Sequence, residues 1–169
     1  ESWKPDGAYL KKLLRLGMPL ALQNIIISVG GLGVQSIING FGYLFIAGFT
    51  AANKLYGLVE LAAVSFGFAA ATYVGQNLGA RQYARIRRGV RAACLMAFCT
   101  SLVVSAVTLF FGHSLIGLFV SKTEPQYDMV LQTAYTYLTV LCVPLSVLYL
   151  LHVHRSALQG LGNMVIPLI

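Results

Sequence analysis

Residues 92–120 read AACLMAFCTSLVVSAVTLFFGHSLIGLFV, a stretch without a single Asp, Glu, Lys or Arg. In a helix, about 20 apolar residues at 1.5 Å each cross the roughly 30 Å hydrocarbon core of a membrane. The stretch is therefore long enough to span a bilayer. Because apolar and polar residues do not alternate in it, it predicts a helix rather than a strand of a membrane barrel.

Dividing the rest of the chain at its charged residues gives three more stretches of this kind. The predicted spans are residues 16–40, 45–79, 92–120 and 129–158, and a fifth begins near residue 164. Of the 169 residues, 57% are hydrophobic and 10% are charged, unlike a soluble domain. The predicted fold is all-α, a polytopic transmembrane bundle of four spanning helices and the start of a fifth. We expect it to be part of a longer protein.

The basic residues predict how the chain is oriented. The net charge is +7, and alternating spans bring every Lys and Arg except Lys54 and Lys122 to one side of the membrane. Lys and Arg are in excess on the cytoplasmic side. The segment before the first span and the loop at residues 79–91 are therefore predicted to be cytoplasmic. A nucleic-acid partner is not expected, because an Arg cluster between two spans offers no separate folded platform.

The Arg-rich loop is amphipathic. Arg81, Arg85 and Arg88 follow the i, i+4, i+7 spacing of one helix face, and apolar side chains lie on another. We interpret residues 79–91 as an interfacial elbow. Its arginines are expected to fix topology and to contact anionic lipid headgroups, in preference to contacting a substrate.

Polar side chains inside the first span are candidates for a transport pathway. Gln23, Asn24, Gln35 and Asn39 would be costly in hydrocarbon unless they turn inward, so they must find partners or water. Gln35 and Asn39 are predicted to face protein or water, with partners on other helices. Three glycines, at residues 30, 31 and 33, interrupt the same span. They indicate either a broken helix that lines a cavity or a close helix crossing, and both interpretations stay open.

The second span contributes Asn53 and Glu60, which share a face rich in small residues. Glu60 is the only acid inside any predicted span. A carboxylate within a membrane is a candidate proton acceptor or cation ligand. Counting about 20 residues back from Asn77, however, places the outer boundary near Gly57. An interfacial charge that snorkels to water is therefore the alternative interpretation of Glu60.

No residues indicate catalysis or a metal site. The three cysteines lie in uncharged apolar stretches and show no CxxC spacing, so they are expected to be structural free thiols. His152 and His154 are two positions apart and point in different directions on a helix, which disfavours a shared metal ion. The chain is not expected to be an enzyme or to hold a cofactor.

Three strings resemble the MATE (multidrug and toxin extrusion) family, and their order covers nearly the whole chain: LGMPL at residues 16–20, VGQNLGA at 74–80 and RSALQGLGN at 155–163. The form of the second string is similar to that of the second of two homologous lobes. The resemblance implies an antiporter of twelve helices in two six-helix lobes in the cell membrane, the inner membrane in a bacterium.

The resemblance also implies the partners. They are the lipid bilayer, a drug or organic cation that is exported, the coupling ion Na⁺ or H⁺, and the remaining helices and lobe of the transporter. Many relatives carry carboxylates on the first and fourth helices of this lobe, whereas the corresponding spans here have none. The coupling acid is then either Glu60 or a residue of the other lobe. A lipid-linked saccharide flippase of a related superfold and a non-transporting membrane scaffold are the alternative functions.

Overall fold

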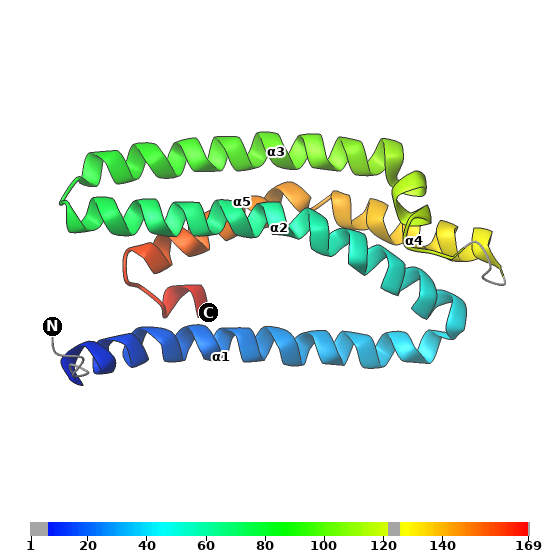
Figure 1. Ribbon diagram of the computed structural model, residues 1–169, viewed down its shortest axis with the longest axis horizontal. Coiled ribbons are helices and arrows are strands. Elements are labelled where there is room, and N and C mark those ends of the chain that lie inside the picture. Colours follow the sequence, from blue (N-terminus) through cyan, green and yellow to red (C-terminus); the bar gives the residue numbers. More distant parts are fainter. Residues whose placement is uncertain (1–6, 122–125, 169) are drawn as a thin grey trace, which may run out of the picture.

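The computed structural model describes residues 7–121 and 126–168, and the secondary structure of these residues is helical, without strands. In chain order the elements are α1 (Gly7–Ile38), η1 (Asn39–Phe41), α2 (Tyr43–Gly79), α3 (Tyr83–Gly117), α4 (Tyr127–Cys142), α5 (Leu145–Gly160) and η2 (Ile166–Leu168). Figure 1 shows α2 to α5 lying side by side as a bundle, with α1 along one flank. The predicted all-α fold is confirmed.

Three of these helices are long and apolar enough to cross a membrane, namely α1 with η1, α2, and α3. The fourth predicted span, residues 129–158, is not one helix. It is the pair α4 and α5, whose axes meet at 53°. The cause is Pro144, which has no N–H to bond the carbonyl four residues earlier and whose ring clashes with that turn. Helical bonding resumes where Leu148 N–H donates to the Pro144 carbonyl at 3.0 Å.

The helix α2 is the centre of the bundle. One core cluster joins it to α4 and the end of α3, and includes Ala52, Ile116 and Val130. A second joins it to α3 and α5 around Ala63 and Tyr149. Small residues allow these close approaches, because membrane helices associate largely through packing.

Two glycines show how tight the α2–α5 crossing is. A Cβ added at Gly67 would lie 2.7 Å from the Ser156 hydroxyl, and one at Gly160 would lie 2.6 Å from the Ala71 carbonyl oxygen. Neither position has room for a side chain. The small-residue face predicted on the second span is therefore used for packing at its Gly67 end.

The helix α1 stands apart from the bundle (Figure 1) and packs chiefly against η1 and η2. It runs unbroken through Gly30, Gly31 and Gly33, and a Cβ added at any of the three would meet nothing within 4 Å. The predicted interruption is thus absent, because glycine permits a break but does not impose one. No other described helix crosses α1 closely at these glycines.

The predicted elbow at residues 79–91 is also different in the structure. The chain reverses in a short turn at Ala80–Gln82, where Arg81 has a φ of 57°, and α3 begins directly at Tyr83. Residues 83–91 are the first turns of α3 and not a separate interfacial helix, since helical bonding continues without a break into the apolar stretch. Lys4 and Lys122, used in the orientation argument, lie outside the described residues.

Candidate functional site: a carboxylate beside the helix bend

Glu60 lies midway along the 37-residue α2 and is half-buried. One turn earlier on the same helix, Tyr56 lies where α4 and α5 meet, because it lines a crevice with Leu141, Pro144 and Leu145. Tyr149 of α5 bonds to the carbonyl of Val59, the residue before Glu60, and Tyr137 of α4 packs against the same core cluster as Tyr56. We call Tyr56, Glu60, Tyr137 and Tyr149 the bend site.

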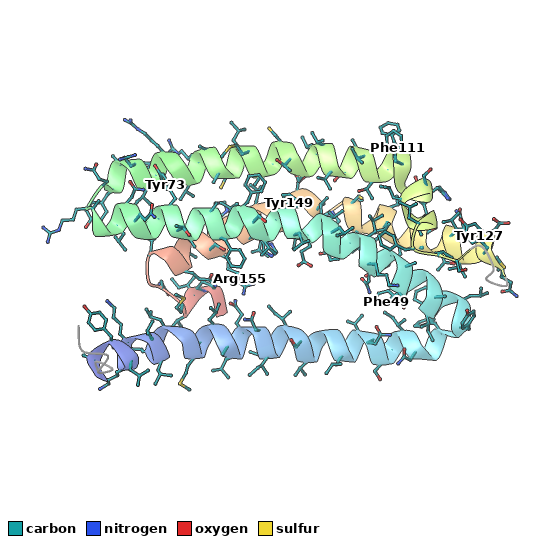
Figure 2. The ribbon with its side chains drawn as sticks, in the orientation of Figure 1. Phe49, Tyr73, Phe111, Tyr127, Tyr149 and Arg155 are labelled. Carbon is teal, nitrogen blue, oxygen red and sulfur yellow. The ribbon has the colours of Figure 1, made fainter. Side chains whose placement is uncertain are left out.

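Packing holds two of the three phenols in place. Tyr149 is fully buried, and its hydroxyl donates to the Val59 carbonyl at 2.8 Å. Figure 2 shows Tyr149 near the middle of the bundle. The ring of Tyr137 lies with its centroid 5.1 Å from that of Phe49. A fixed ring positions its hydroxyl at little further entropic cost, which suits a binding site.

The bend also opens a crevice beside Tyr56. Its volume is about 210 Å³, and its walls include Leu141, Pro144, Leu145 and Leu148. These walls are apolar, and the Tyr56 hydroxyl is the polar side-chain group that lines the crevice. A carboxylate, hydroxyls and the carbonyls that a broken helix leaves without donors are oxygen groups that can receive a proton or ligate Na⁺.

Gln23 forms a second polar arrangement, near the middle of α1. Its side chain is only 8% exposed. The Arg155 guanidinium of α5 donates to Gln23 Oε1 at 2.6 Å, and Gln23 Nε2 donates to the Pro167 carbonyl of η2. This amide bridge ties α1 to α5 and η2. Both ends of the Gln23 amide thus have a partner, which an amide in an apolar span requires.

Gln35 and Asn39 behave differently from the prediction. Gln35 Nε2 donates to Asn39 Oδ1 at 3.0 Å, so the two amides pair with each other and not with a neighbouring helix. Their i, i+4 spacing makes this pairing available locally. Of the other predicted residues, Asn24 is exposed on α1 and Asn53 is half-buried on α2. The polar side chains of the first two spans therefore do not form a single site.

The remaining candidates lie outside the bend site. Arg81, Arg85 and Arg88 are exposed where α2 and α3 meet. Cys94, Cys99 and Cys142 are free thiols. Within residues 7–121 and 126–168, no three His, Cys, Asp or Glu side chains gather as metal ligands would.

The three tyrosines and Pro144 were not among the residues predicted from the sequence. A proline inside the predicted span 129–158 was a signal for the bend. Tyr56 and Glu60, one helical turn apart, were a signal for a phenol beside the carboxylate. The positions of Tyr137 and Tyr149 depend on how α4 and α5 pack on α2, which no local pattern reports.

Helices that are long and apolar enough to span define a class, a multi-pass α-helical membrane protein. The model of the MatE family matches residues 19–169, and the chain belongs to this family of membrane transporters, which are not enzymes. The resemblance noted in the sequence is thereby confirmed.

Three curated relatives are similar to the chain. The probable multidrug resistance protein YoeA of Bacillus subtilis is 28% identical over 73% of this chain and 27% of its own length. The probable multidrug resistance protein YpnP of the same species is 30% identical over 66% and 25%. The probable multidrug resistance protein NorM of Mannheimia succiniciproducens is 27% identical over 71% and 26%. The chain thus spans about a quarter of the length of these relatives.

Proposed function

We propose that the full-length protein exports drugs or organic cations by antiport with Na⁺ or protons, and that this chain forms part of its second lobe. Membership of the MatE family and the multidrug resistance named in the relatives support this function. In such a transporter the lobes rock around a cavity near the membrane midplane.

Glu60 is the coupling residue in this proposal, and its position is the observation that carries it. Among the described residues it is the one carboxylate in the interior of a long apolar helix. It stands midway along α2, one turn from Tyr56 and next to Val59, whose carbonyl accepts from Tyr149. A carboxylate within a span is costly, so it is a candidate for a functional role.

The bend at Pro144 allows the bend site to change its conformation during transport. Discontinuous helices at the binding sites of transporters present freed carbonyls and allow one part of a lobe to move against another. A proton or Na⁺ on Glu60 neutralises the carboxylate. It thereby lowers the cost of moving the carboxylate through an apolar environment.

The test is the Glu60→Gln variant of the full-length protein, reconstituted in vesicles with an imposed proton or sodium gradient. Gln preserves the shape and removes the titratable charge, so gradient-driven drug efflux is expected to fall at least about tenfold while drug binding is retained. The matched control is Asp128→Asn, because Asp128 is exposed in the first turn of α4. Efflux at the wild-type rate in the Glu60 variant would move the coupling site to another part of the transporter.

A further inference from the structure

A second crevice, unrelated to the bend site, opens between α2 and α3 towards the turn that joins them. Its volume is about 410 Å³, and its walls include Phe66, Ala70 and Tyr73 of α2 and Gly89, Ala92 and Met96 of α3. These groups are apolar apart from the Tyr73 hydroxyl, which donates to the Arg85 carbonyl at 3.3 Å. Figure 2 shows Tyr73 between the two helices near this end. The crevice is an apolar slot that begins close to the Arg-rich turn.

Gly89 gives the crevice its shape. A Cβ at this position would lie 2.1 Å from Tyr73 Cε1, so the ring rests directly on the backbone of α3. The tyrosine thus forms a wall at the charged end of the slot. Beyond it, alanines on both helices leave the space unfilled.

The arginines of α3 divide into two pairs with respect to this crevice. On α3 the crevice is lined by residues 89, 90, 92, 93 and 96. At about 100° per residue, Arg85 lies within the arc of these residues and Arg88 about 40° outside its Ala92 edge. Arg87 lies about 60° outside the Val90 edge, and Arg91 about 100° outside the Ala92 edge. All four side chains are exposed.

No described carboxylate offsets this charge nearby. Glu60 is midway along α2, and Asp128 is at the opposite end of the bundle, in the first turn of α4 (Figure 1). The mouth of an apolar slot is thus positively charged at the level where a span meets the headgroups. Basic pockets between membrane helices are typical sites for anionic lipid headgroups.

We infer that the crevice binds one anionic glycerophospholipid, with an acyl chain in the slot and its phosphate on Arg85 and Arg88. Guanidinium groups match the geometry of phosphate oxygens and can form paired hydrogen bonds with them. The apolar walls of the slot would contact the acyl chain. A free phosphate would use the arginines but not the slot. The site stands whether or not the protein transports drugs.

The test is native mass spectrometry of the full-length protein in detergent, titrated with phosphatidylglycerol or phosphatidylcholine. The Arg85→Gln/Arg88→Gln variant is expected to lose affinity for phosphatidylglycerol by about tenfold or more. Each arginine near an anionic headgroup contributes about 1 kcal/mol of binding free energy, and about 1.4 kcal/mol corresponds to a tenfold change in affinity. The matched control is Arg87→Gln/Arg91→Gln, with the same loss of charge on the same two turns. It should change the affinity less than about threefold.

A second variant tests the slot separately from the charge. Ala92→Trp fills the crevice from an exposed position and leaves every arginine in place. It should weaken phosphatidylglycerol binding, while binding of the headgroup analogue glycerol phosphate stays as in the wild type. Equal losses from the two arginine pairs, equal affinity for the two lipids, or full phosphatidylglycerol affinity in Ala92→Trp would each overturn the inference.

Discussion

Gln23 shows how one buried amide can join separate helices. Its oxygen accepts from Arg155 and its nitrogen donates to the Pro167 carbonyl, so both ends of the group are satisfied. Removing Arg155 alone leaves the buried Gln23 oxygen without its bond, whereas replacing Gln23 as well removes that oxygen and leaves only the half-buried Pro167 carbonyl without its donor. The bridge is therefore expected to respond to single and double substitutions in opposite ways.

We predict that Arg155→Ala lowers the free energy of unfolding of the full-length protein by about 1–3 kcal/mol. The Gln23→Leu/Arg155→Ala double variant should recover part of that loss. Denaturant unfolding in mild detergent measures both, with Arg91→Ala as a control that removes an exposed cation. A double variant that is less stable than Arg155→Ala alone would contradict the role of the bridge.

For single residues, the sequence showed which polar side chains inside the spans need hydrogen-bond partners, but not which residues those partners are. Gln23 was recognisable because an amide inside an apolar span must be satisfied. The sequence placed Arg155 near the cytoplasmic end of the fourth span, but nothing in it brings that span against the first. Gln35 and Asn39 found each other because a helix offers a partner four residues away before any tertiary contact forms.

Among the elements, the pair α4 and α5 depends most clearly on one residue. Pro144→Ala restores the N–H that the Val140 carbonyl would bond in a continuous helix. We predict that the pair then straightens from its 53° bend, and that its two ends move apart by up to about 5 Å at 1.5 Å per residue.

Spin labels at the exposed positions Asp128 and His154 would measure the change as a distance distribution. Val143→Ala, the exposed neighbour of the proline, is the control and should leave the distribution unchanged. An unaltered distance in Pro144→Ala would show that packing on α2, and not the proline, holds the bend.

The positions of the long helices were predictable from the sequence, but the places where a helix is broken or continuous were not. The uncharged stretches marked the long helices because length and apolarity decide spanning. The glycines of the first span suggested a break that α1 does not have, while the proline of the fourth span made a break that hydropathy did not report. Glycine allows a helix to break but does not require it, whereas proline removes a helical hydrogen bond and so breaks or kinks the helix.

At the scale of the whole molecule, α1 leaves much of its apolar surface uncovered. Ile26 and Leu32, for example, are 62% and 70% exposed. The chain spans about a quarter of its relatives' length. We propose that lipid and the remaining helices of the transporter cover this surface, because isolated apolar surface of this extent is otherwise unfavourable in water.

The arrangement of the ends leads to a prediction about topology. Figure 1 shows the start of α1, the α2–α3 turn and the end of α5 at one end of the molecule, with η1 and the start of α4 at the other. The first group carries most of the Lys and Arg, which favours the cytoplasm. Single cysteines at Gln82 and Asn163 should therefore be protected from an impermeant maleimide in intact cells, and one at Asp128 should react.

The experiment needs a background without reactive thiols, because Cys94, Cys99 and Cys142 are free and Cys99 is exposed. Replacing all three with alanine provides it, and permeabilised cells give the full extent of labelling at each position. With Asp128 as the positive control on the same chain, rapid labelling of the Gln82 cysteine from outside would reverse the orientation. It would also place the Arg-rich turn, and with it the inferred lipid site, in the outer leaflet.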